Sequence, residues 1–246
     1  MILLGAIVVV GAWFGWRLLL RDTATPVSPP AAPVTSGSPG AVEPPLGEPG
    51  IYVFATTGSE QIDALAGAGH DYPVETLLTL SSSGCGLTGR WQPLEERWDT
   101  YEICSPGHGN TSSFVAFHQW FGQPDLQEFS CDGGTWLAPE DGPRAPRTLT
   151  CSTEDRTEVY RSQLVGRELA TIAARTVDTV HVRTTSTLTG ATAGESRIDI
   201  WWISGTALPA RIVVERESVT DSIIGEVTYR ESYDAALLST VPRPDP

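Results

Sequence analysis

The chain has 246 residues and a formal net charge of −14, with 30 acidic side chains against 16 basic ones. This acidity argues against a nucleic-acid-binding protein, because phosphate binding requires a cationic surface. It also argues against tight adsorption to anionic lipid headgroups. All the basic side chains are arginine, a composition that indicates a high-GC bacterium such as an actinobacterium.

The chain begins with an apolar segment that is followed by a proline-rich stretch. Residues 1–21 are apolar apart from Arg17 and Arg21, which predicts a membrane anchor or a cleaved signal segment. Residues 22–49 contain eight prolines and no aromatic residue, which predicts a disordered linker. Folded protein is therefore expected over residues 50–246.

The charges around the apolar segment conflict with the rest of the sequence. Arg17 and Arg21 lie on its C-terminal side, which by the positive-inside rule would place the following domain in the cytoplasm. The cysteines and the linker instead indicate an extracytoplasmic domain. A start codon upstream of Met1, adding a basic leader, would remove the conflict.

Period-two alternation of apolar and polar residues runs through the folded region and predicts strands. We therefore expect an all-β domain, a strongly curved antiparallel sheet that forms a half-barrel or a sandwich, preceded by an N-terminal transmembrane helix. The expected strands are residues 72–82, 97–104, 113–121, 176–189, 197–203, 211–219 and 225–233. Only two short segments, 61–65 and 93–97, are helix candidates.

The two parts of the folded region share a faint repeat. The trio Tyr52, Gly58 and Glu60 has the spacing of Tyr160, Gly166 and Glu168. This match suggests two similar halves, residues 50–152 and 157–246.

Four cysteines, Cys85, Cys104, Cys131 and Cys151, form an even set without a Cys-x-x-Cys motif. In an oxidising compartment such a set indicates two disulfides rather than a zinc or redox site. Three connectivities are open. We favour Cys85–Cys104 and Cys131–Cys151, since each would close one hairpin.

No catalytic motif, cofactor fingerprint or metal-ligand spacing is present, so no enzyme activity, cofactor or metal is expected. The four histidines, His70, His108, His118 and His181, are too scattered to suggest a metal site, with His70 and His108 placed in glycine-rich turns. The densest acidic group is Glu95, Glu96, Asp99 and Glu102. Because Arg90, Arg97 and Trp98 are interleaved with it, we expect a solvated strand-and-turn face.

Aromatic residues are the remaining candidates for a binding site. Trp201 and Trp202 are adjacent, so in a strand they must point to opposite faces. Trp120 lies in a strand with apolar residues on both faces. Such a strand indicates either burial between two sheets or a concave surface that holds a ligand. Trp120, Trp201 and Trp202 are our candidates for that lining.

A strand that carries Trp201 and Trp202 runs into the sequence Leu208-Pro209-Ala210-Arg211, between flanking strands at 179–183 and 225–229. This part of the chain resembles the bacterial lipoprotein-carrier-like superfamily that includes LolA, LppX and RseB-like proteins. The resemblance implies a bent antiparallel sheet whose concave face holds acyl chains or a lipoprotein tail. The chain as a whole is similar to secreted or membrane-anchored actinobacterial proteins.

These features together predict a non-enzymatic domain held at the outer side of a membrane by its N-terminal segment, or secreted if that segment is cleaved. The expected ligand is a lipid, a lipidated protein or another amphipathic envelope component. The alternative is a protein-interaction or sensor ectodomain without a small-molecule ligand.

Overall fold

The computed structural model describes residues 22–30, 47–64, 68–84, 86–104, 113–132, 147–222 and 225–243. All regular structure in these ranges is β-strand, which confirms the all-β prediction. The strands are β1 (Gly50–Ile62), β2 (Ala68–Asp71), β3 (Glu75–Ser82), β4 (Gly86–Leu94), β5 (Arg97–Cys104), β6 (Ser113–Trp120), β7 (Gln123–Asp132), β8 (Arg147–Ser152), β9 (Arg156–Ile172), β10 (Arg175–Gly190), β11 (Thr192–Ile203), β12 (Pro209–Ser222) and β13 (Gly225–Leu237).

The sheet closes on itself into an antiparallel barrel of 12 strands, with β2 as an additional strand. Strand β1 makes the closure because it has two partners. Its residues Gly50–Ala55 pair with β3, and Phe54–Ile62 pair with β13. The short strand β2 then covers the end of β1 that β3 leaves free. The predicted half-barrel or sandwich is therefore corrected to a closed barrel.

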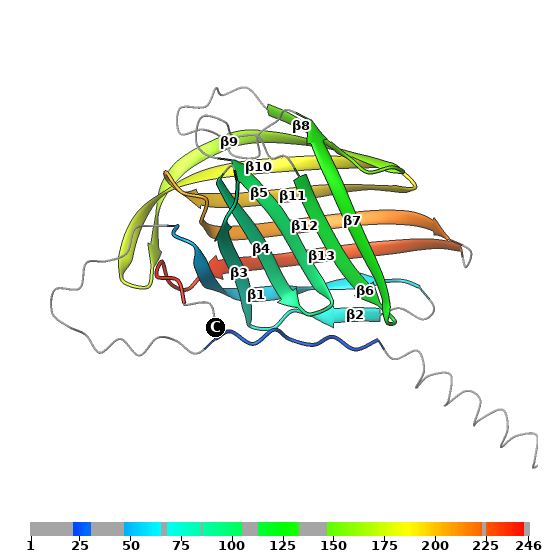
Figure 1. The fold of residues 1–246 in the computed structure, drawn as a ribbon, viewed down its shortest axis with the longest axis horizontal. Coiled ribbons are helices and arrows are strands. Elements are labelled where there is room, and N and C mark those ends of the chain that lie inside the picture. Colours follow the sequence, from blue (N-terminus) through cyan, green and yellow to red (C-terminus); the bar gives the residue numbers. More distant parts are fainter. Residues whose placement is uncertain are drawn as a thin grey trace, which may run out of the picture.

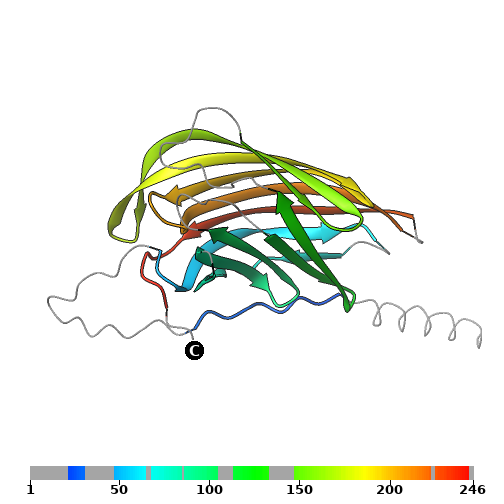
Figure 2. The same ribbon diagram turned by 45° about the horizontal axis from the view of Figure 1, so that its top comes forward.

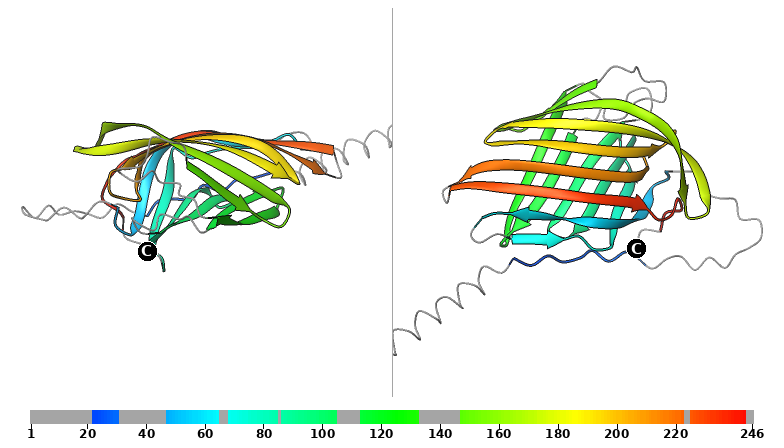
Figure 3. Two further views of the ribbon diagram at one scale, coloured as in Figure 1. Left: turned by 90° about the horizontal axis from the view of Figure 1, so that it is seen from above. Right: turned by 180° about the vertical axis from the view of Figure 1, so that it is seen from behind.

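The barrel is flattened, so that two walls pack against each other. Strands β3–β7 cross the long strands β9–β13 at a steep angle (Figure 1; Figure 3, right). Seen from a tilted viewpoint, β9–β13 arch over the shorter strands (Figure 2). The interior is consequently filled by side chains from both walls, as in small barrels generally.

Alternate residues of most strands point inward, and they form an apolar core between the walls. This is the physical result of the period-two pattern in the sequence. The largest fully buried members are Tyr52, Phe54, Leu78, Leu80, Leu94, Ile203, Leu208 and Val182. A second, smaller cluster lies under β6–β9 and contains Phe114, Ala116, Phe129, Leu149, Cys151 and Tyr160.

One glycine is required where β1 approaches β13. Gly58 has φ +146°, and a Cβ there would lie 2.3 Å from the carbonyl oxygen of Ser232. Near this residue the partner of β1 changes from β3 to β2, and the carbonyl of Gly58 accepts a hydrogen bond from the amide of Tyr72 at 2.9 Å. The closure of the barrel therefore requires a backbone conformation that glycine adopts at little cost.

Residues 22–30, which the sequence assigns to the linker, lie against the barrel wall; we call them the strap. Pro26 forms a bridge with Leu94, and the carbonyl of Thr25 accepts a hydrogen bond from the amide of Glu95 at 2.9 Å. The sequence did not predict these contacts. The expected membrane segment, residues 1–21, lies outside the described residues. Within the described ranges, no helix has the length and apolar character needed to span a bilayer.

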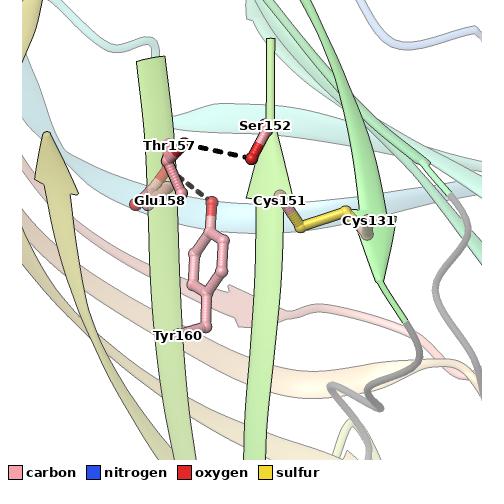
Figure 4. Close-up of a disulfide and its surroundings, with 6 residues drawn as sticks. All are labelled: Cys131, Cys151, Ser152, Thr157, Glu158 and Tyr160. Atoms are coloured by element: carbon pink, nitrogen blue, oxygen red, sulfur yellow. Dashed lines mark hydrogen bonds between the residues drawn. A yellow bond between two sulfur atoms is a disulfide. The ribbon is translucent and has the colours of Figure 1, made fainter. Parts of the chain in front are cut away.

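The disulfide Cys131–Cys151 is present and joins β7 to β8, which confirms one of the two predicted pairs (Figure 4). The two strands pair over only three residues, so the covalent bond reinforces a short contact between them. The second predicted pair, Cys85–Cys104, lies outside the residues whose side chains are described.

Neither helix candidate is helical in the residues that the structure describes. Residues 61–62 complete β1, and residues 93–97 form the end of β4, a turn and the start of β5. Both segments are too short to nucleate a stable helix, and the strands on either side of them are stabilised by pairing in the sheet. The proposed duplication of the two halves stays a prediction.

Candidate functional site

One end of the barrel, which we call the mouth, carries the turn between β6 and β7 and the turn between β10 and β11 (Figure 1). A cavity of about 190 Å³ lies near this end. It is lined by Ile62, Phe114, Ala116, His118, Trp120, Asp125, Gln127, Phe129, Arg156, Glu158, Leu188, Thr192, Gly194, Glu195, Ser196, Arg216, Glu217, Ser218, Thr220, Val227 and Tyr229.

The mouth cavity has an apolar part and a polar part. The apolar part comes from β6, β7 and β10, which contribute Phe114, Phe129 and Leu188. The polar side chains come from β6, β7, β9, β11, β12 and β13, and among them Arg216 and Tyr229 point inward. The cavity can thus cover an apolar group and hydrogen-bond a polar group.

Arg216 brings a positive charge to the cavity lining. Its side chain is 17% exposed, and its Nη1 lies 3.4 Å from Oε2 of Glu231. Burial lowers the pKa of this guanidinium, but the charges of Glu231, Asp99 and Glu158 outweigh burial and raise it. Arg216 therefore stays charged and offers N–H donors to the cavity.

Behind the cavity lies a layer of buried charge, centred on Arg97. This side chain is fully buried, and its Nη1 and Nη2 donate to the two oxygens of Asp99 at 2.6 and 2.8 Å. Its Nε and Nη2 also contact Oε1 of Glu231 at 3.1 and 3.0 Å. The bidentate geometry and the second carboxylate compensate for the cost of burying the guanidinium.

Glu60 of β1 is the second centre of this layer. Its Oε1 contacts Nδ1 of His70 at 2.9 Å, and its Oε2 accepts a hydrogen bond from the hydroxyl of Tyr229 at 3.1 Å. Nδ1 of His118 lies 3.4 Å from the same Oε2. Burial raises the pKa of Glu60, but the contacts with His118 and His70 and the charge of Arg97 outweigh burial and lower it to about 2.

Buried tyrosines supply neutral donors to the same carboxylates. The hydroxyl of Tyr72 donates to Oε1 of Glu231 at 2.6 Å. Burial, followed by the negative charge of Glu231, raises the pKa of Tyr72 and of Tyr229 well above the ordinary value. Both hydroxyls therefore keep their protons at any physiological pH.

The three tryptophans that the sequence singled out lie in three different places. Trp120 is buried and lines the mouth cavity, whereas Trp202 belongs to the apolar core. Trp201 is half-buried; its ring stacks on His181 with centroids 4.1 Å apart, and its Nε1 donates to Glu168. The structure does not bring the three together, and of the three only Trp120 lines the described cavity.

The expectation that Arg97 and Asp99 belong to a solvated face is wrong. They point into the barrel from β5, while Trp98 between them faces outward and stacks on Phe117 with centroids 5.2 Å apart. The signal available in the sequence was the alternation Arg97, Asp99, Tyr101, which places three polar side chains on the same face of a strand. His70, expected in a turn, lies in β2 and is buried.

No group of three or more His, Cys, Asp or Glu side chains within the described part of the chain is arranged to hold a metal ion. The carboxylates of the buried layer are held instead by arginine, histidine and tyrosine.

No protein-family model and no curated protein matches the sequence. Among solved structures, the chain is similar to the hypothetical lipoprotein YmcC from Escherichia coli K12, with a TM-score of 0.33 and 12% sequence identity. The similarity covers 78% of this chain and 89% of that one. A likeness this distant carries no functional information.

Proposed function

We propose that this protein is a non-enzymatic, extracytoplasmic barrel that binds a small amphipathic envelope component in its mouth cavity, while its N-terminal segment tethers it to the membrane. The observation that carries the proposal is the composition of one cavity. Its lining combines aromatic and aliphatic side chains with a charged guanidinium.

The apolar part of the ligand would lie against Phe114, Phe129, Leu188 and Trp120. Removing apolar surface from water contributes about 25 cal/mol for each Å² buried, so even a short hydrocarbon group gains affinity here. Aromatic rings add area without losing much side-chain freedom, because each has only two rotatable bonds.

The polar part of the ligand would accept hydrogen bonds from Arg216 and Tyr229. A carboxylate, phosphate ester or hydroxyl group has the required acceptors. The cavity lining also contains the carboxylates Asp125, Glu158, Glu195 and Glu217, so a ligand with several negative charges would be repelled. The best match is a neutral or singly charged head group.

The volume limits the size of the ligand. Pockets for drug-sized molecules span about 300 to 1,000 Å³, whereas this cavity has about 190 Å³. A single short chain fits that volume, and a lipid with several acyl chains exceeds it. The proposal thus narrows the sequence-based expectation from lipids in general to a single-chain amphiphile.

The disulfide supports the proposed location of the domain outside the cytoplasm. Cys131 and Cys151 are bonded, and stable disulfides form in oxidising spaces outside the cytoplasm.

Native mass spectrometry of the full-length protein, purified from its own envelope in a mild detergent, tests for a retained ligand. Titration with 1-anilinonaphthalene-8-sulfonate, an aromatic probe with one anionic group, then tests the cavity. The variant Leu188→Trp fills the cavity and should lower probe affinity about tenfold or more. The control Leu126→Trp enlarges a side chain that is 52% exposed on β7 and should leave affinity unchanged. Equal affinity in both variants would rule the cavity out as the binding site.

The alternative is a protein-interaction or sensor ectodomain. The space between the walls holds the apolar core and the buried charged layer besides the cavity, which limits the room for a small molecule. If no small molecule co-purifies and the probe does not bind, a protein partner at the outer surface becomes the better explanation.

A further inference from the structure

His70 lies between two buried carboxylates that come from different parts of the chain. Its Nδ1 is 2.9 Å from Oε1 of Glu60, and its Nε2 is 3.0 Å from Oδ2 of Asp22. The side chains of Asp22 and His70 are 8% and 3% exposed. A neutral imidazole has one N–H and one lone pair, so it can satisfy only one of the two carboxylates. Only the protonated ring can bind both.

The two contacts of His70 differ in strength. The contact with Glu60 is an aligned hydrogen bond, whereas the contact with Asp22 is an ion pair without hydrogen-bond alignment. Its strength comes from the charge on the ring. Loss of the proton therefore removes the attraction to Asp22 first and leaves the bond to the barrel strand β1 available.

Asp22 is the first residue of the strap, and its other oxygen is also bound. Oδ1 of Asp22 accepts a hydrogen bond from the amide of Phe121 at 2.8 Å, in the turn between β6 and β7 at the mouth. Further along the strap, Thr25 donates its amide and hydroxyl to the two oxygens of Glu96 at 2.8 and 2.9 Å. Those more distant contacts do not involve His70.

We propose that His70 is a protonation-dependent latch that fastens the beginning of the strap to the mouth of the barrel. In the closed state the imidazolium holds Asp22 against the turn at Phe121. In the open state the ring is neutral, Asp22 is free, and the strap is held only from Thr25 onward. The expected membrane segment ends just before Asp22 in the sequence, so the latch would determine how closely the mouth is held to that segment.

The groups around His70 set the direction of the pH dependence. Trp120 of β6 stacks on the ring, and Glu60 is shared with His118 of β6, Tyr229 of β13 and Arg97 of β5. Burial lowers the pKa of His70, but Glu60 and Asp22 outweigh burial, and the net change is upward. The latch is thus closed below this raised pKa and opens as pH rises through it.

Nuclear magnetic resonance of the full-length chain in detergent micelles tests the latch through two signals. The ring of His70 reports its own titration, and the backbone amide of Phe121 reports the contact with Asp22. From about pH 5 to about pH 9, both should change with one midpoint. Protection of the Phe121 amide from hydrogen exchange, corrected for the intrinsic rate, should fall about tenfold or more above that midpoint.

Two variants separate the latch from a general loosening of the strap. Asp22→Asn should shift the titration midpoint of His70 downward and leave Phe121 weakly protected at every pH. Thr25→Val removes one of the distant contacts and should leave the midpoint and the Phe121 signal unchanged. The proposal is overturned if Phe121 protection stays constant while His70 titrates, if Asp22→Asn does not move the midpoint, or if His70 does not titrate in this range.

Discussion

The indole ring of Trp120 stacks on the imidazole of His70, with ring centroids 4.3 Å apart and planes inclined by only 10°. Trp120 also lines the mouth cavity, and His70 holds Asp22. One pair of rings therefore joins the proposed ligand site to the proposed latch. A cation over an aromatic face is stabilised by the ring's quadrupole, so the stack favours the protonated imidazole.

Replacing Trp120 by leucine should lower the pKa of His70, because the charged ring loses its aromatic neighbour while Glu60 and Asp22 stay in place. A ring titration followed by nuclear magnetic resonance measures the shift. Trp98→Leu is the matched control, since Trp98 stacks on Phe117 at the outer surface and does not contact His70. An unchanged midpoint in Trp120→Leu would mean that the stack contributes only packing.

Arg97 should be the most sensitive charged residue in the barrel. Arg97→Met removes the partner of Asp99 and one partner of Glu231 and leaves buried carboxylates poorly compensated, which costs about 3 to 5 kcal/mol. Arg230→Gln is the control, because that arginine pairs with Glu217 at the surface and the pair contributes about 0 to 1 kcal/mol. Urea unfolding of both variants measures the difference. Similar losses in the two would contradict a buried charged layer that is important for stability.

How much of this layer could be predicted from the sequence depends on the distance along the chain between its members. The alternation of β5 predicts a strand over Arg97–Cys104, and that prediction is confirmed. The inward face of Arg97 could not be predicted, because Glu231, its partner besides Asp99, is 134 residues away and meets it only when β13 closes on β1. A polar side chain on one isolated strand is normally exposed, and only the closed barrel adds this second carboxylate.

The disulfide illustrates the opposite case. Cys131 and Cys151 are 20 residues apart. The even cysteine count predicted disulfides in an oxidising compartment, and the hairpin expected between these two residues favoured their pairing.

Trp201 and Trp202 were predictable in part. Their adjacent positions in a strand predict that the two rings face opposite sides of the sheet. The groups that cover them could not be predicted, because His181 and Arg211, which cover Trp201, and the opposite wall, which covers Trp202, come from other strands.

Acid should destabilise the protein through Glu60. Its folded-state pKa of about 2 lies below the ordinary value of 4.5, so its stabilising contribution is fully present above pH 4.5 and is lost as pH falls toward 2. The contribution is on the order of 3 kcal/mol. Glu60→Gln should flatten the fall of unfolding free energy across this range, as measured by urea unfolding at several pH values. A slope equal to that of the unaltered protein would assign the acid sensitivity to other carboxylates, such as Asp99.

Removing the disulfide should destabilise the barrel without changing its fold. In the chain-entropy model, a closed loop of 20 residues contributes about 3 kcal/mol by restricting the unfolded chain. The double variant Cys131→Ser with Cys151→Ser should therefore lower the unfolding free energy by about that amount and retain the β-sheet circular dichroism spectrum. Because chemical reduction is not selective for one disulfide, the double variant is the cleaner test. A loss of sheet signal would mean that the bond is required for β7 to pair with β8 at all.

Two glycines in long strands provide a matched test of barrel closure. Gly58→Ala should be strongly destabilising, because the added Cβ meets the backbone of Ser232 and Tyr233 at 2.3 and 2.5 Å and the residue has φ +146°. The strand must then shift away from β13, at a cost of about 2 kcal/mol or more. In contrast, a Cβ at Gly166 of β9 has no neighbour within 4 Å, so Gly166→Ala should be close to neutral. Thermal unfolding of the two variants makes the comparison, and equal melting temperatures would contradict the close approach of β1 to β13 that closes the barrel.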